Sequence, residues 1–243
     1  MSYNSLKAKK LVKRYGERTV VNNVDVELNR GEVVGLLGPN GAGKTTTFYM
    51  LTGMIKPFSG EIFLDDENVT NLPMYKRSQK GVGYLAQDAS VFTKLSVEDN
   101  IKLVLEMTEL SAEEQTEKLE KLIDEFSIGH IRNNKGFALS GGERRRLEIA
   151  RSLVTDPSFI LLDEPFAGID PIAVEDIQGI INTLKSKNIG VLITDHNVRE
   201  TLSITDRSYL LYNGEILKSG TTKELTKDED VKKLYLGTKF KLD

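Results

Sequence analysis

The segment Gly38-Pro-Asn-Gly-Ala-Gly-Lys-Thr45 decides the fold of this chain. It matches the pattern GxxxxGK followed by Ser or Thr, and it joins a short apolar run, Val33 to Leu37, to a predicted helix from Lys44 to about Leu51. Glycines allow the backbone to wrap around an anion so that N–H groups point at phosphate oxygens, and the positive end of a helix dipole adds to the attraction. The segment therefore predicts a strand, a phosphate-binding loop and a helix in succession.

Two side chains of this loop have expected parts in binding ATP and Mg²⁺. Lys44 is expected to neutralise the β- and γ-phosphates and to assist catalysis, and the Thr45 hydroxyl is expected to ligate Mg²⁺. The alternative is a flexible glycine turn, but the strand before the loop and the helix after it favour phosphate binding. The residues predicted to line the phosphate site are Gly38, Pro39, Asn40, Gly41, Ala42, Gly43, Lys44, Thr45 and Thr46.

A second apolar run, Phe159 to Leu162, ends in the carboxylates Asp163 and Glu164. In an open parallel sheet, ligands bind outside the carboxyl ends of the strands, so both acids are expected beside the phosphates. Asp163 is placed to hold the water shell of Mg²⁺, and Glu164 to polarise the attacking water as a general base. The alternative is a strand that simply ends in charged residues at the surface, and the phosphate loop in the same chain argues against it.

A third motif, Leu139-Ser-Gly-Gly-Glu143, overlaps the start of a predicted helix from Gly142 to Val154. Ser140, Gly141 and Gly142 at a helix N-terminus form another anion-binding site. One chain needs a single cradle for the γ-phosphate, so the second cradle predicts two chains that face each other, each completing the other's nucleotide site. The alternative is an ordinary helix cap with flexible glycines.

Composition excludes several classes of protein. The 243 residues hold 33 Lys and Arg against 36 Asp and Glu, a net charge of −3, which argues against a nucleic-acid partner. The lack of cysteine excludes disulfides, zinc–thiolate sites and cysteine nucleophiles. The longest apolar runs have four residues, whereas a membrane span needs about 20, and no signal peptide is recognisable. We expect a chain that stays in the compartment where it is made.

The pattern of elements predicts an α/β fold in one domain. Strands alternate with helices over 1–88 and 140–220, and an all-helical insert is expected over about 89–139. Within these parts, Ser111 and Glu114 predict a capping box, and Asp170 is the expected N-cap of a helix. The tail, 221–243, interleaves lysines with acids and is expected to form a solvated helix.

The motifs resemble, in type and order, those of the ATPase subunits of ABC transporters, over essentially the whole chain. The resemblance implies a RecA-like core of the P-loop NTPases with an antiparallel β subdomain and a helical subdomain. The motifs that carry it are the phosphate loop, Gln87 after a strand, Leu139–Glu143, Phe159–Pro165, Ala167-Gly-Ile-Asp170 and His196.

Four further residues take roles from this resemblance. Tyr15 resembles the aromatic residue that stacks on adenine, although an isolated Tyr near a strand is otherwise a packing residue. Gln87 resembles the residue that reaches Mg²⁺ and senses the membrane partner. His196 resembles the switch residue at the γ-phosphate, although an isolated His after a strand is more often a capping or core residue. Asp170 resembles the residue that couples the two sites of a dimer.

The chain departs from the family pattern at two positions. Glu143 stands where Gln is commoner in the signature, and Ala86 stands where many relatives have Pro. Neither change removes a phosphate ligand, so ATP binding is still expected. Because Glu164 is present, hydrolysis is expected as well.

Four stretches resemble most the ATPases of lipopolysaccharide export in Gram-negative bacteria: 89–101, 139–151, 194–202 and 231–237. The alternative is the ATPase of a branched-chain amino-acid importer. Either resemblance implies a homodimer, peripheral on the cytoplasmic face of the inner membrane, that binds two integral membrane subunits. Their coupling helices would enter a groove near Gln87 that Phe92 and Leu95 line, unless these two residues only close the core of the domain. No direct contact with the lipid cargo is expected.

Two rival functions are less consistent with the sequence. A cytosolic ABC ATPase that acts on DNA or ribosomes usually carries a coiled-coil insert or two cassettes, and neither is apparent here. A P-loop kinase would leave the motif at Ser140 and the acid Asp170 without a function.

Overall fold

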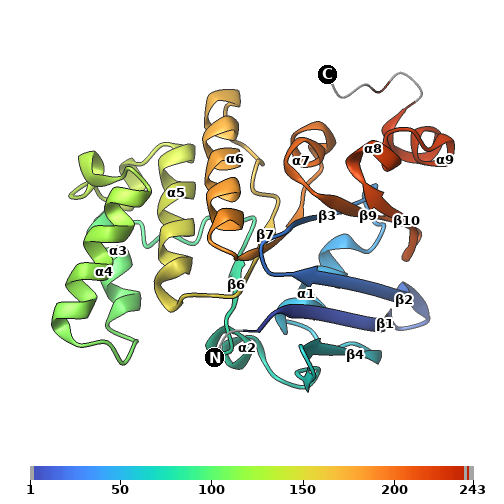
Figure 1. Ribbon diagram of the computed structural model, residues 1–243, viewed down its shortest axis with the longest axis horizontal. Helices are drawn as coiled ribbons and strands as arrows, with labels where there is room; N and C mark the ends of the chain where they lie inside the picture. The colour runs from blue at the N-terminus through green and yellow to red at the C-terminus, as the bar shows by residue number, and fades with distance from the viewer. Residues whose placement is uncertain (1–2, 238–239, 241–243) are drawn as a thin grey trace.

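A six-stranded sheet forms the centre of the computed structural model, which describes residues 3–237 and residue 240 (Figure 1). The strand order is β10-β9-β3-β8-β7-β6, and only β10 runs antiparallel to its neighbour. Three central strands are buried at every position, as expected of parallel strands with both faces covered. The strands are β3 (Val33–Leu37), β6 (Val82–Leu85), β7 (Phe159–Asp163), β8 (Gly190–Thr194), β9 (Arg207–Tyr212) and β10 (Glu215–Thr221).

Alternate residues of these strands serve two hydrophobic cores. In β7, Ile160 and Leu162 pack with the helices α5 and α6, whereas Phe159 and Leu161 pack with α1 and the second sheet. Because successive strand residues point to opposite faces, each strand belongs to both cores. The helices that cover this sheet are α1 (Lys44–Thr52), α5 (Gly141–Ser152), α6 (Pro171–Ser186) and α7 (Val198–Ile204).

The second sheet is antiparallel, in the order β2-β1-β4-β5, and lies beside α1 (Figure 1). The sequence predicts a strand over Val20 to Leu28, which is most of β2, but it predicts no bounds for β1, because the apolar residues of β1 do not alternate regularly. A register shift between Ala8 and Leu11, with Lys10 at φ 52°, lets both apolar side chains face the core. The strands are β1 (Ser5–Tyr15), β2 (Arg18–Asn29), β4 (Ser59–Leu64) and β5 (Glu67–Asn68).

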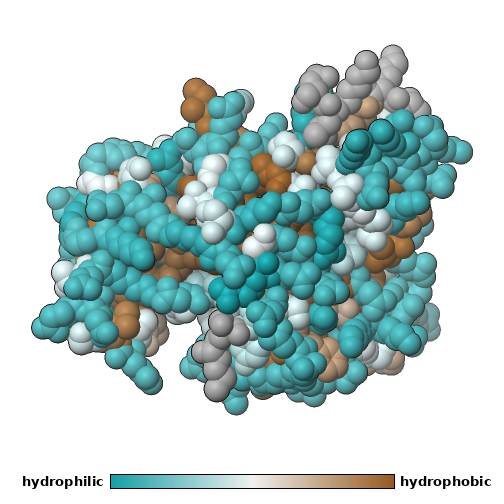
Figure 2. All heavy atoms as spheres, viewed as in Figure 1, coloured by the Kyte–Doolittle hydropathy of each residue, from teal (hydrophilic) through white to brown (hydrophobic). Residues whose placement is uncertain are grey.

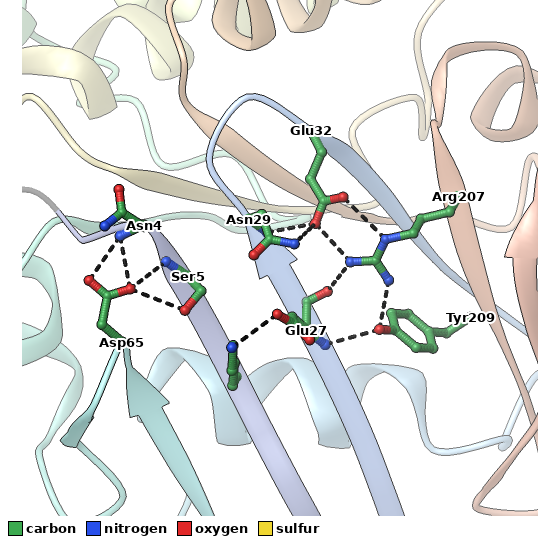
Figure 3. A network of polar contacts seen from close by, with 9 residues as sticks. Asn4, Ser5, Glu27, Asn29, Glu32, Asp65, Arg207 and Tyr209 are labelled. Carbon is green, nitrogen blue, oxygen red and sulfur yellow. Dashed lines mark hydrogen bonds and ion pairs between the residues drawn. The ribbon is translucent and has the colours of Figure 1, made fainter.

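A polar network fastens the two sheets together (Figure 3). Arg207 of β9 donates to the Glu32 carboxylate at 2.7 and 3.1 Å and to the Glu27 carbonyl of β2 at 2.7 Å. It also donates to the Tyr209 hydroxyl at 2.7 Å, and that hydroxyl accepts from the Glu27 N–H at 3.1 Å. The antiparallel sheet is therefore held at a fixed angle to the strands that carry the phosphate loop.

The helical insert contains α3 (Val97–Leu105), α4 (Ala112–Glu125), η1 (Gly129–Ile131) and η2 (Gly136–Ala138). The predicted capping box of Ser111 and Glu114 forms at the start of α4, and Ser96 with Asp99 forms another at α3. The sequence indicates only a turn around Asn71, Leu72 and Pro73, and the short helix α2 (Met74–Gln79) that follows it was not predicted.

The tail does not form the single solvated helix that the charge pattern suggests. It contains α8 (Thr222–Leu225), α9 (Glu229–Val231) and η4 (Lys232–Leu236), and Leu225 and Val231 are buried against Leu37. The few apolar residues between the charges decide this packing.

Within the described residues, no helix is both long enough and apolar enough to span a membrane. Figure 2 shows one face of the molecule, where hydrophilic residues predominate and hydrophobic ones form small separate groups.

Candidate nucleotide site

The phosphate loop adopts a conformation that only glycine permits at its tightest points. Gly38 has φ 150°, and a Cβ atom there would clash with the Leu211 carbonyl oxygen. Gly43 has φ 101° and precedes α1 without a side-chain cap, so the first N–H groups of α1 have no side-chain acceptor at this position. These uncapped groups and the helix dipole favour an anion at this end of the helix.

Lys44 is buried, and its ammonium group lies within the loop itself. It donates to the carbonyl oxygens of Gly38 at 2.6 Å and Pro39 at 3.1 Å. Burial lowers the pKa of Lys44, and the nearby negative charges of Glu164 and Asp163 oppose this change. The hydroxyl-bearing Thr45 follows at an exposed position. The Lys44 ammonium group is thus held at a place where the oxygens of a phosphate bound in the loop could replace the two carbonyl oxygens that now accept its hydrogen bonds.

The two acids after β7 have different surroundings. Asp163 is buried, and burial raises its pKa to about 6, with the charge of Glu164 adding to the increase. Glu164 is partly exposed and adopts φ 46°, while its N–H donates to the Thr194 carbonyl at 2.6 Å. A non-glycine residue in this left-handed region is uncommon. Strand β8 therefore holds the backbone of Glu164 in a turn that separates the two carboxylates.

Three residues predicted from separate motifs meet at one carboxylate oxygen. Gln87 donates to Oε2 of Glu164 at 2.7 Å, and Nδ1 of His196 lies 3.2 Å from the same oxygen. Gln87 follows β6, Glu164 follows β7 and His196 follows β8. The carboxyl ends of parallel strands meet at one edge of the sheet, which explains the convergence.

The sequence analysis did not single out Asp195, which organises this edge. Its buried carboxylate accepts from the N–H groups of Phe166 at 3.0 Å and Asn197 at 2.7 Å. Burial raises the pKa of Asp195, and these two donors oppose the increase. The acid thereby joins the segment after Glu164 to the segment that carries His196. Its only sequence signal is its place directly before His196.

Two further residues that the sequence analysis missed, Arg145 and Glu148, clamp the Gln87 segment to α5. Arg145 donates to the Ala86 carbonyl at 2.9 Å and pairs with Glu148 at 3.1 Å. Glu148 accepts from the Ser90 N–H at 2.6 Å. Both side chains are buried. Gln87 therefore lies between two points, Ala86 and Ser90, that are attached to the helix following the Ser140 motif.

The remaining predicted residues lie on other parts of the surface. Ser140 and Glu143 form a reciprocal capping box at the start of α5, and Asp170 caps α6 by accepting from the Ala173 N–H at 3.0 Å. A Cβ atom at Gly142 would lie 2.9 Å from the Cβ of Ala173, so the two helix starts touch. Tyr15 is exposed near the end of β1, with the Lys13 ammonium 5.3 Å from its ring centre.

The oxygen-bearing side chains predicted to hold a metal suit a hard cation whose other ligands come from phosphate. Thr45, Gln87 and Asp163 offer oxygen atoms, which Mg²⁺ prefers. In the described part of the chain, no three His, Asp or Glu residues gather as a metal cluster. Mg²⁺ normally keeps several waters and takes its other ligands from the nucleotide, so a sparse set of protein ligands fits this ion.

Comparisons with known proteins agree with this geometry. The family model described as ABC transporter matches residues 21–167. The chain is 54% identical over 238 residues to the lipopolysaccharide export system ATP-binding protein LptB of Haemophilus influenzae, covering 98% of this chain and 99% of that protein.

Solved structures extend the likeness to the fold. The crystal structure of the ADP conformation of an ATP-binding cassette of an ABC transporter superimposes with a TM-score of 0.86 at 28% identity, covering 97% of this chain and 100% of that one. A dimeric post-hydrolysis cassette bound to ADP and phosphate gives a TM-score of 0.77 at 26% identity, over 89% of this chain and 98% of that one. The predicted P-loop NTPase fold is confirmed, and the chain belongs to the ATP-binding cassettes of ABC transporters, which are ATPases coupled to transport.

Proposed function

We propose that this ATPase powers the extraction of lipopolysaccharide from the inner membrane and its export to the outer membrane. The observation that carries the proposal is the 54% identity, over nearly the full length, to a protein named as the ATP-binding protein of lipopolysaccharide export. Identity at this level covers the motifs and also the helical insert and the tail. On this proposal the protein is peripheral on the cytoplasmic face of the inner membrane and transmits force without touching the lipid. The importer alternative has no observation in its favour.

The residues at the nucleotide site have the following proposed roles. The phosphate loop, from Gly38 to Thr46, binds the phosphates of ATP, and Lys44 exchanges its carbonyl partners for phosphate oxygens. Bound Mg²⁺, held through Thr45, Gln87 and Asp163, supplies charge neutralisation at the β- and γ-phosphates. Tyr15 stacks on the adenine, which its exposed ring permits.

Glu164 is the proposed general base for the attacking water. In the arrangement described here its Oε2 atom accepts from Gln87 and lies beside His196. A water that Glu164 orients through Oε2 would share this oxygen with Gln87, and release of Gln87 would free the oxygen for the water. His196 then remains to contact the γ-phosphate. Release of Gln87 is thus a step by which a partner at the Gln87 segment could license hydrolysis.

The proposed active form is a homodimer with two ATP molecules at its interface. Each molecule would lie between the phosphate loop of one chain and the Ser140–Gly142 site of the other, with Glu143 and Asp170 beside it. The glycine-containing start of α5 at Ser140–Gly142 supports this arrangement, as does the likeness to a dimeric cassette. The dimer would close when ATP binds and reopen after hydrolysis, and this movement would drive the membrane subunits.

Two integral membrane subunits are the proposed partners, with coupling helices beside Gln87 and Phe92. The Phe92 ring is 49% exposed and lies 5.3 Å from the Arg151 guanidinium, while Leu95 is half-buried. The exposure of Phe92 supports a partner contact over the alternative that it closes the core. Arg151 also donates to the Ser90 carbonyl at 2.7 Å, so a helix pressing on Phe92 would act on the segment that positions Gln87.

A pull-down from solubilised membranes of the native host tests the cargo. Glu164→Gln protein, loaded with ATP, serves as bait, and the captured membrane subunits are identified by mass spectrometry. We expect the membrane subunits of lipopolysaccharide export. Recovery of amino-acid permease subunits in their place would refute the cargo while leaving the ATP site intact. A parallel bait with Lys44→Ala, which should not load ATP, controls for capture that is independent of nucleotide.

A further inference from the structure

The carboxylate of Asp195 binds the backbone on both sides of the pair formed by Glu164 and His196. Its Oδ1 atom accepts from the Asn197 N–H at 2.7 Å, and its Oδ2 atom accepts from the Phe166 N–H at 3.0 Å. The first bond forms an Asx turn, in which a side chain binds the N–H group two residues further on, so the turn encloses His196. The second bond reaches the turn that follows Glu164. One buried side chain therefore connects both segments.

The His196 ring depends on its backbone for its position. The side chain is 61% exposed, so packing restrains the ring only weakly. Nevertheless, Nδ1 of His196 lies 3.2 Å from Oε2 of Glu164. A contact this short requires the two backbones to be held in a fixed relation, because a displacement of about 1 Å would break it. The Asp195 carboxylate is the side chain that supplies such a link.

A main-chain hydrogen bond joins the same two segments independently of Asp195. The Glu164 N–H donates to the Thr194 carbonyl at 2.6 Å, and the strands β7 and β8 are paired up to these positions. These contacts remain when the side chain of Asp195 is changed. Loss of the carboxylate should therefore loosen the placement of His196 against Glu164 while the sheet stays folded.

We propose that Asp195 is a positioning residue for ATP hydrolysis, whose carboxylate holds the His196 ring at Glu164 by binding the backbone on each side of this pair. Asp195 itself does not contact the nucleotide and acts only through His196. The proposal rests on the roles proposed above for Glu164 and His196 in hydrolysis, and it does not depend on the cargo.

Asp195→Asn is the direct test, because the amide has the same shape as the carboxylate but only one acceptor oxygen. Its NH2 group would face one of the two N–H donors. We expect kcat for ATP to fall about tenfold to a hundredfold, the effect of losing one hydrogen bond to a charged group. The KM for ATP and the Kd for MgADP should stay within about twofold, because the phosphate loop is untouched.

Asp65→Asn is the matched control. The Asp65 carboxylate also accepts from two backbone N–H groups, those of Asn4 and Ser5, at 2.8 to 3.1 Å (Figure 3). It lies in the turn between β4 and β5, outside the nucleotide site. The substitution removes the same kind of contact, so kcat of this variant should stay within about twofold even where its thermal midpoint falls.

Nuclear magnetic resonance of the histidine rings separates positioning from a role in stability alone. The chain has two histidines, and His130, which is 66% exposed, serves as the internal reference for His196. Glu164→Gln should shift the His196 signals because the two side chains are in contact. In the Asp195→Asn background, the same substitution should shift them less than half as much. A residue that only stabilised the fold would leave this response unchanged in the folded protein.

Wild-type kcat in Asp195→Asn overturns the proposal, and so does an undiminished response of His196 to Glu164→Gln in that background. His196→Ala distinguishes this failure from a failure of the proposed site. If His196→Ala keeps the wild-type kcat, the proposed role of His196 is wrong and this inference falls with it. If His196→Ala loses activity and Asp195→Asn does not, the proposed site stands and only the positioning role of Asp195 is refuted.

Discussion

Replacing Arg77 by Met tests how the helix behind the phosphate loop is held. The Arg77 side chain is 1% exposed, and it donates to four backbone carbonyls, those of Met50, Leu51, Leu72 and Thr70, at 2.7 to 3.0 Å. Met50 and Leu51 lie in the last turn of α1, where carbonyl groups lack partners among the helical residues, and the Met50 carbonyl also accepts from the Gly53 N–H at 3.2 Å. The guanidinium satisfies them and places a positive charge at the negative end of the helix dipole.

The expected loss of stability follows from these contacts. Burial lowers the pKa of Arg77 to about 10, so the group stays charged at pH 7. Each hydrogen bond to a charged group contributes about 1.5–3 kcal/mol, and several kcal/mol of the sum is offset by the cost of burying the charge. With Met in its place, the cost disappears but the buried carbonyls lose their donor. We expect the free energy of unfolding to fall by about 3–5 kcal/mol, a large part of the 5–15 kcal/mol typical of a domain.

Urea denaturation of the nucleotide-free protein at pH 7 measures this loss. The dependence of the unfolding free energy on urea concentration should stay unchanged. Arg18→Met is the control, because Arg18 is exposed at the start of β2 and should change stability by no more than about 0.5 kcal/mol. A loss below about 1 kcal/mol for Arg77→Met would refute the reasoning, since the four hydrogen bonds would then contribute no more than their desolvation costs.

Three other predictions concern the dimer, the membrane partner and acid stability. Glu164→Gln should trap ATP as a stable dimer in light scattering, about twice the 27.2 kDa of one chain, and a monomer with ATP bound would contradict the dimer. Phe92→Ala should keep the soluble ATPase activity but co-purify poorly with the membrane subunits, so unchanged co-purification would argue against the groove. Contacts with Arg132 and Lys102 hold the pKa of Glu98 at about 2, below its ordinary 4.5. The ionised carboxylate therefore stabilises the fold fully at pH values above 4.5, and this contribution is lost as the pH falls towards 2. Glu98→Gln should therefore be less stable than wild type at pH 7, with a difference that narrows as the pH falls from 4.5 towards 2; a constant difference would contradict this origin.

Local patterns carried much of the fold prediction. The glycines and the lysine of Gly38–Thr45 form one continuous segment, and the apolar run that ends in Asp163 is a strand whose burial on both faces leaves no alternation. Capping residues act within one helical turn, so the box at Ser111 and the cap at Asp170 could be predicted from spacing alone. Strand β1 was less accessible, because the bulge near Lys10 breaks the alternation that reveals a strand.

The candidate site divides in the same way. The residues expected to contact the nucleotide lie in sequence motifs that can be recognised locally. The residues whose contacts position them lie outside any such motif. Arg145 donates to the carbonyl of Ala86, far away in the chain, and Val231 of the tail packs in one cluster with Leu37 of β3. Neither side chain has a distinctive neighbour in the sequence. Only folding brings these partners within reach.

The sequence by itself determined the phosphate-loop segment, the order of most strands and helices in the core and the residues expected to bear the chemistry, because each depends on interactions between near neighbours in the chain. The tertiary structure decided what those residues contact: the meeting of Gln87, Glu164 and His196, the clamp of α5 on the Gln87 segment and the packing of the tail on β3. These contacts join segments that come together only when the strands align at one edge of the sheet. Their geometry is set by packing and by buried polar groups that must find distant partners.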